Sequence, residues 1–173
     1  MDLSNKKVMI LAANQFEDIE LYYPLLRLKE DNIKVDIVGE KADQKYSGKH
    51  GMPIKSDCSF SNINTEDYDG ILIPGGWAPD RLRRYTEVKK IIKKINSSKK
   101  LIGTICHAGW VLASADIVNG RRVTSVSAIK DDLEHAGAIW EDKEVVIDKN
   151  LITSRTPKDL PTYMKTIIDK LSE

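Results

Sequence analysis

Residues Leu101–Trp110 read LIGTICHAGW, an apolar strand that stops at a cysteine. His107 and two small residues follow Cys106, a pattern typical of a tight turn from a strand into a helix. In a parallel α/β sheet such a turn projects its side chain from the carboxyl end of the strand, where ligands bind. The stretch therefore predicts a parallel sheet with Cys106 in its ligand-binding crevice.

The segments around this stretch alternate between strands and helices. Apolar runs at 7–13, 33–39 and 69–76 predict further buried strands, and helical spacing at 16–32 and 86–98 predicts helices between them. In the first helix we expect Ile19, Tyr22, Tyr23, Leu26 and Leu28 to form the repeating apolar pattern. The alternation predicts an α/β fold, a three-layer sandwich with a mostly parallel central sheet.

The remaining segments are expected outside this core. Residues 45–57 alternate around two glycines like a hairpin laid outside the main sheet, and residues 143–154 read as a peripheral strand pair. A short helix at 128–137 and a last helix from about 158 to 171 complete the pattern. Because no linker, repeat or low-complexity tract interrupts the chain, we expect a single domain over residues 1–173.

Charge and cysteine content exclude several classes of protein. The 173 residues include 27 basic and 26 acidic side chains, so there is no net field to attract nucleic acid or an anionic membrane. The lysines of residues 89–100 follow an amphipathic helical pattern and are expected in solvent. The first apolar run is too short to span a membrane and lacks a cleavage-like tail, and the two cysteines favour free thiols, so we expect a cytoplasmic protein.

Two loops are predicted to face one pocket. Gly75 and Gly76 follow one strand, Cys106 and His107 follow another, and the carboxyl ends of parallel strands meet at one edge. A helix amino terminus at Cys106 would lower the pKa of its thiol and make it a nucleophile. The alternative is that Cys106 packs in the core, as free cysteines often do.

Several motifs together resemble one family. ICHAG at 105–109, LIPGGWAPDRLR at 72–83, ANQFEDIEL at 13–21 and GKHG at 48–51 resemble the PfpI family of intracellular proteases and deglycases. The resemblance covers nearly the whole chain and implies the flavodoxin-like sandwich that the order of elements predicts. It also implies a distant relation to class I glutamine amidotransferases, but the His-x-Glu motif of those enzymes is missing, since no such glutamate follows His135.

The resemblance implies roles for particular residues. Cys106 is the nucleophile, His107 the general base, and Glu17 the carboxyl group that contacts the sulfur, protonated when the thiolate forms. The backbone N–H of Gly76, with that of His107 or Ala108, forms the oxyanion hole. Asp80 reaches the Nδ1 atom of His107 from a neighbouring subunit, which implies a homo-oligomer, a dimer or hexamer. Without the family, Glu17 and Asp80 would be read as helix-start charges.

Three functions follow from the resemblance. The first is a glutathione-independent glyoxalase or deglycase that acts on small carbonyl compounds, glycated proteins or peptides and needs no cofactor or metal. The second is a cysteine peptidase, and the third a redox-sensing or chaperone-like stress protein without turnover. Cys58 matches no motif, and Trp77 and Trp110 either form a wall of the pocket or pack in the core.

Overall fold

The computed structural model describes residues 2–173, and its centre is a sheet of seven strands in the order β10-β11-β7-β6-β1-β2-β5. All neighbouring strands are parallel except β10 and β11, which are antiparallel. The strands are β1 (Lys7–Leu11), β2 (Lys34–Gly39), β5 (Cys58–Ser59), β6 (Gly70–Ile73), β7 (Leu101–Ile105), β10 (Val145–Asp148) and β11 (Leu151–Ser154).

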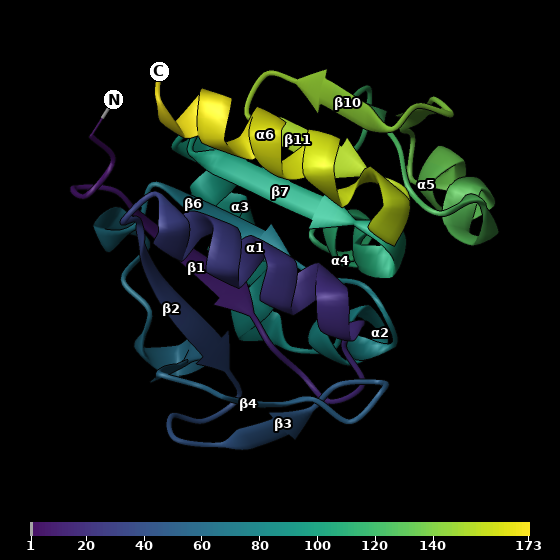
Figure 1. The fold of residues 1–173 in the computed structure, drawn as a ribbon. Coiled ribbons are helices and arrows are strands. Elements are labelled where there is room, and N and C mark those ends of the chain that lie inside the picture. Colours follow the sequence, from purple (N-terminus) through teal and green to yellow (C-terminus); the bar gives the residue numbers. More distant parts are fainter. Residues whose placement is uncertain (1) are drawn as a thin grey trace.

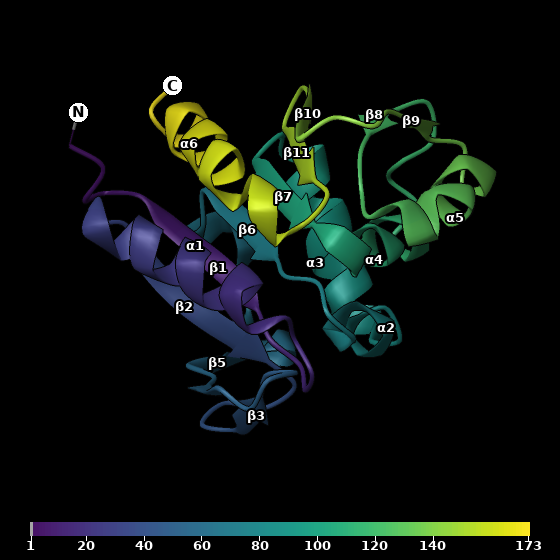
Figure 2. The ribbon, with the colours of Figure 1, turned by 45° about the vertical axis from the view of Figure 1, so that its right-hand side comes forward.

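Helices cover both faces of this sheet. The helices α1 (Asp18–Glu30) and α6 (Leu160–Leu171) lie side by side on one face, and α3 (Thr86–Ser97) lies on the other (Figures 1 and 2). The short helices α2 (Ala78–Leu82) and α4 (Gly109–Ser114) lie at the carboxyl ends of the strands (Figure 1), and α5 (Lys130–His135) packs on α4. The predicted flavodoxin-like three-layer sandwich is confirmed.

Two small sheets lie outside the main one. The predicted hairpin is β3 (Lys45–Ser47) paired with β4 (Pro53–Lys55), and β8 (Arg122–Val123) pairs with β9 (Ile139–Trp140). The prediction that residues 143–154 are peripheral is wrong, because β11 pairs in parallel with β7 and extends the main sheet. The side chains of β11 are all buried between helices and neighbouring strands, as expected for an inner strand.

The first helix turns a different face to the sheet from the one its apolar pattern predicts. Ile19 and Leu26 are largely exposed, whereas the buried side chains are those of Glu20, Leu21, Pro24, Leu25 and Leu28, with Asp18 at the start. These residues recur at three- and four-residue spacing, so the buried stripe is helical but includes a carboxylate. Glu20 is only 2% exposed.

The strand order changes direction at β1. From β1 the chain adds β2 on one side, whereas β6 and β7 extend the sheet on the other side. Such a change of direction leaves a crevice beyond the carboxyl ends of the strands. The starts of α1, of the loop after β6 and of the turn after β7 all lie there. Within residues 2–173, no helix has the length and apolar composition needed to cross a membrane.

Candidate active site

Cys106 lies on a strained turn between a strand and a helix. It follows β7 directly and opens a short 3-10 turn, Cys106–Ala108, that leads into α4. Its φ angle of 60° is in the left-handed region that side chains other than glycine rarely adopt. The turn therefore holds the partly buried thiol at the strand end, in the geometry of a nucleophile elbow.

The glycine pair after β6 allows the chain to approach this thiol closely. A Cβ atom added at Gly75 would lie 2.6 Å from Cβ of Cys106 and 2.5 Å from Oε2 of Glu20. Gly76 has a φ angle of 71°, and a Cβ atom there would meet the backbone nitrogen of Glu17 at 2.4 Å. Only glycine fits both positions without moving the neighbouring backbone or the side chains of Glu20 and Cys106.

Backbone N–H groups from both loops lie near the sulfur of Cys106. Those of Gly76 and His107 lower the pKa of the thiol. Ala108 is fully buried in the turn. An oxyanion hole formed by Gly76 with His107 or Ala108 stays a prediction.

The carboxyl group beside the sulfur belongs to Glu20 and not to Glu17. Oε2 of Glu20 accepts the N–H of Gly75 at 2.8 Å, and a Cβ atom added at Gly75 would meet both Oε2 of Glu20 and the sulfur of Cys106. Its other oxygen, Oε1, is buried without a hydrogen-bond partner. The expectation for Glu17 fails because Glu17 is the N-cap of α1, whereas Glu20 lies one turn later, in the stripe that faces the crevice.

Glu20 and Cys106 each hinder the ionisation of the other. Burial removes water from the carboxylate of Glu20 and, together with the nearby charge of Glu17, raises its pKa to about 7. Burial and the charge of Glu20 raise the pKa of the Cys106 thiol to about 12, although the two backbone N–H groups lower it. The prediction of a lowered thiol pKa is therefore wrong while Glu20 is ionised, because burial and like charge outweigh the effect of the turn.

His107 lies against the thiol and between two indole rings. Its Nδ1 atom is 3.2 Å from the sulfur, and its ring centroid is 5.8 Å from that of Trp77 and 5.1 Å from that of Trp110. Burial, together with the positive charge of Lys49, lowers the pKa of His107 below its ordinary value of 6.5. The imidazole is neutral at pH 7 and can accept a proton at Nδ1.

Glu17 contacts the loop between β3 and β4. Its carboxylate is 3.4 Å from Nζ of Lys49 and 3.2 Å from Nε2 of His50. Asp18 accepts the backbone N–H groups of His50 at 2.8 Å and Met52 at 2.9 Å. The start of α1 thus fixes the loop that carries Lys49, whose charge acts on His107.

Glu17, Asp18 and His50 also place three potential metal-ligand atoms close together. Both carboxylate oxygens of Asp18 already accept N–H bonds, and the ammonium group of Lys49 lies beside Glu17. Donors that are already used and a neighbouring positive charge disfavour a cation at this place.

Asp80 is turned away from His107 within this chain. It lies on α2, and its carboxylate binds Nη2 of Arg84 at 2.6 Å. Because Nδ1 of His107 faces the sulfur, only Nε2 is available to an acidic partner, which corrects the expected contact at Nδ1. A role for Asp80 across subunits stays a prediction.

Cys58 lies at the edge of the sheet on β5 and takes no part in this site. Its sulfur is 3.9 Å from a carboxylate oxygen of Asp36, and burial raises its thiol pKa. Sequence reasoning missed Glu20, because the apolar pattern of this helix indicated a different buried face.

Fold and site together define a flavodoxin-like α/β protein with a cysteine on a strained turn, a neighbouring histidine and a buried glutamate. The model of the DJ-1/PfpI family matches residues 6–170. The chain belongs to the DJ-1/PfpI family.

Named relatives and a solved structure agree with this assignment. "Deglycase PH1704" of Pyrococcus horikoshii is 42% identical over 165 residues, which cover 95% of this chain and 99% of the relative. "Putative cysteine protease YraA" of Bacillus subtilis is 36% identical over 167 residues, with 96% and 99% covered. The crystal structure of Drosophila melanogaster DJ-1beta has a TM-score of 0.91 at 27% identity and covers 96% of this chain and 90% of that one.

Proposed function

We propose that the protein is a cysteine-dependent enzyme that acts on reactive carbonyl compounds, as a glyoxalase without glutathione and as a deglycase of early glycation adducts. The observation that carries this proposal is the contact of one thiol with both a buried carboxyl group and a neutral imidazole. A relative named as a deglycase supports it.

The thiol can ionise when Glu20 is protonated. A pKa of about 7 leaves a substantial fraction of this carboxyl group neutral at physiological pH. The neutral acid does not repel a thiolate and can donate a hydrogen bond to it. His107 accepts the thiol proton at Nδ1, which lies 3.2 Å from the sulfur.

For a 2-oxoaldehyde such as methylglyoxal, the steps balance without a cofactor. The Cys106 thiolate adds to the aldehyde carbon, and the new alkoxide takes up the proton held by His107, giving a hemithioacetal. A base then removes the proton from that carbon and a proton returns to the neighbouring carbon, so one carbon is oxidised, the other is reduced, and a thioester results. Water hydrolyses the thioester to a 2-hydroxy acid and restores the thiol.

The experiment compares three substrates against one substitution. Purified protein is incubated with methylglyoxal, a glycated peptide and a fluorogenic peptide, each beside a Cys106→Ser variant and a Cys58→Ser control. We expect turnover of the first two substrates, lost in Cys106→Ser and retained in Cys58→Ser. Turnover that survives Cys106→Ser would exclude the proposed site, and a hundredfold loss in Cys58→Ser would place the chemistry elsewhere.

A peptidase is the second candidate, favoured by the relative named as a cysteine protease. Acyl transfer depends on an acid that orients the histidine, and within residues 2–173 no carboxylate contacts His107. This activity would therefore need Asp80 of a neighbouring subunit in a homo-oligomer. If only the fluorogenic peptide is cleaved, the protein is a peptidase and not a carbonyl enzyme. If Cys106 oxidises and no substrate is turned over, the function is redox sensing.

A further inference from the structure

An open cavity lies at the opposite end of the sheet from Cys106. It has a volume of about 560 Å³ and lies between the end of α3, the starts of β7 and β11, and the last turn of α6. Lys99 and Asn150 line it, and they closely precede the two strands. Because Cys106 follows the far end of β7, the two sites are separated by the length of a five-residue strand, about 16 Å.

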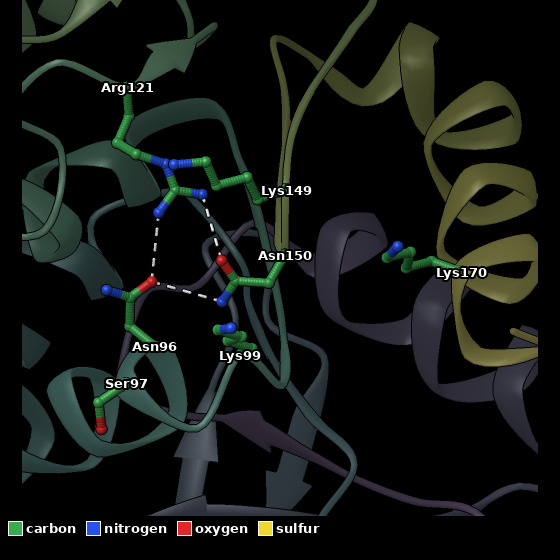
Figure 3. A pocket seen from close by; sticks show the side chains of 7 residues that line it. All are labelled: Asn96, Ser97, Lys99, Arg121, Lys149, Asn150 and Lys170. Atoms are coloured by element: carbon green, nitrogen blue, oxygen red, sulfur yellow. Dashed lines mark hydrogen bonds between the residues drawn. The ribbon is translucent and has the colours of Figure 1, made fainter.

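The cavity is lined by four positive side chains and no carboxylate. They are Lys99, Arg121, Lys149 and Lys170, which come from different loops and helices (Figure 3). Asp148 forms an ion pair with Arg121, with Nε and Oδ1 3.0 Å apart, and Glu173 pairs with Lys170. Among residues 2–173, Lys99 and Lys149 have no ion-pair partner, which leaves two uncompensated charges.

The polar groups at the base of the cavity are largely hydrogen-bonded to one another. Arg121 donates to the side-chain oxygens of Asn96 and Asn150, each at 3.2 Å (Figure 3). Asn150 donates to the oxygen of Asn96 at 3.4 Å and to the carbonyl of Lys100 at 2.9 Å. This network is thus paired within the protein, and the lysine ammonium groups are the donors left for a ligand.

The alternative is that these lysines only complement the carboxyl ends of α3 and α6. That effect accounts for single cations in a last helical turn, such as Lys170. Lys149 lies instead in the turn between β10 and β11, at no helix end, yet it lines the same cavity. A cavity that gathers cations from separate elements around a fixed amide network is better explained by an anionic ligand.

We infer that this cavity is a binding site for a small phosphate-bearing anion, distinct from the site of Cys106 and independent of the proposed function. No aromatic side chain lines it, so it offers no stacking surface for a nucleobase. Arg121 is engaged with Asp148 and the two asparagines and has no free fork for a carboxylate. The free charges are lysine ammonium groups, which bind phosphate oxygens as point charges.

The test is calorimetric titration of pyrophosphate into the Cys106→Ser protein at low ionic strength, with inorganic phosphate and citrate as comparison ligands. We expect one pyrophosphate per chain, bound more tightly than phosphate or citrate and weakened by added salt. The double variant Lys99→Gln with Lys149→Gln should lose at least about tenfold in affinity, because both free charges are removed. Lys41→Gln, an exposed lysine outside the cavity, should bind as the parent does.

An NMR titration tests the site without substitution. We expect pyrophosphate to shift the backbone amide signals of Lys99, Lys149 and Asn150, and not that of Cys106. The inference is overturned if no saturable binding occurs, if the double variant binds equally well, or if the shifted amides lie elsewhere. Tighter binding of citrate would overturn the assignment to phosphate.

Discussion

Replacing Glu20 by glutamine should make Cys106 more acidic. Glutamine keeps a hydrogen-bond donor beside the sulfur and removes the charge that opposes the thiolate. Two unit charges about 4 Å apart in a partly buried site repel each other by about 4 kcal/mol, which equals about three pKa units. Burial is the larger cause of the raised thiol pKa, and it remains in the variant. We therefore expect the pKa of Cys106 to fall from about 12 by about two units.

The assay is the rate of Cys106 alkylation by iodoacetamide as a function of pH. A Cys58→Ser background leaves one reactive thiol, since the chain has two cysteines. At pH 8 the Glu20→Gln protein should react about ten to a hundred times faster, because the thiolate fraction rises tenfold for each unit by which the pKa falls.

Glu17→Gln is the matched control. The carboxylate of Glu17 is paired with Lys49 and His50 and acts on the thiol only through Glu20. We therefore expect this substitution to change the pKa of the Cys106 thiol by less than about half a unit. The reasoning is refuted if Glu20→Gln leaves the thiol pKa unchanged, or if Glu17→Gln lowers it as much.

Three further predictions concern stability, packing and assembly. Because the pKa of Glu20 is raised, its protonated form contributes stability below pH 4.5 that is lost as pH rises through 7. Between these two values the free energy of unfolding of the wild type, measured by urea unfolding, should fall by about 3 kcal/mol relative to that of Glu20→Gln. Gly75→Ala should abolish turnover while circular dichroism stays native, because the new methyl group displaces Glu20 and Cys106; full activity would contradict the close approach. Asp80→Asn should lower peptidase activity more than methylglyoxal turnover, and mixing it with Cys106→Ser subunits should restore activity; no recovery despite proven exchange would confine Asp80 to its contact with Arg84.

Local patterns in the sequence were sufficient for the fold class, although not for the place of β11 in the main sheet. Continuous apolar runs separated by amphipathic helices specify parallel strands with helical crossovers, because strands buried on both faces need helices to cover them. The turn at Cys106 was equally readable, since a strand that ends in a cysteine, a histidine and small residues leaves little choice of geometry. These features depend on neighbours in the chain.

Only the tertiary structure decided which carboxyl group meets the thiol. Glu17 and Glu20 are three residues apart at the start of one helix, and the rotation of α1 on the sheet turns Glu20 inward and leaves Glu17 to Lys49 and His50. The thiol pKa also depends on both levels. The local turn favours a thiolate, whereas burial and the charge of Glu20, which the tertiary structure sets, oppose it. Helix rotation, desolvation and the gathering of lysines from separate elements are set by packing between distant segments, which spacing along the chain does not encode.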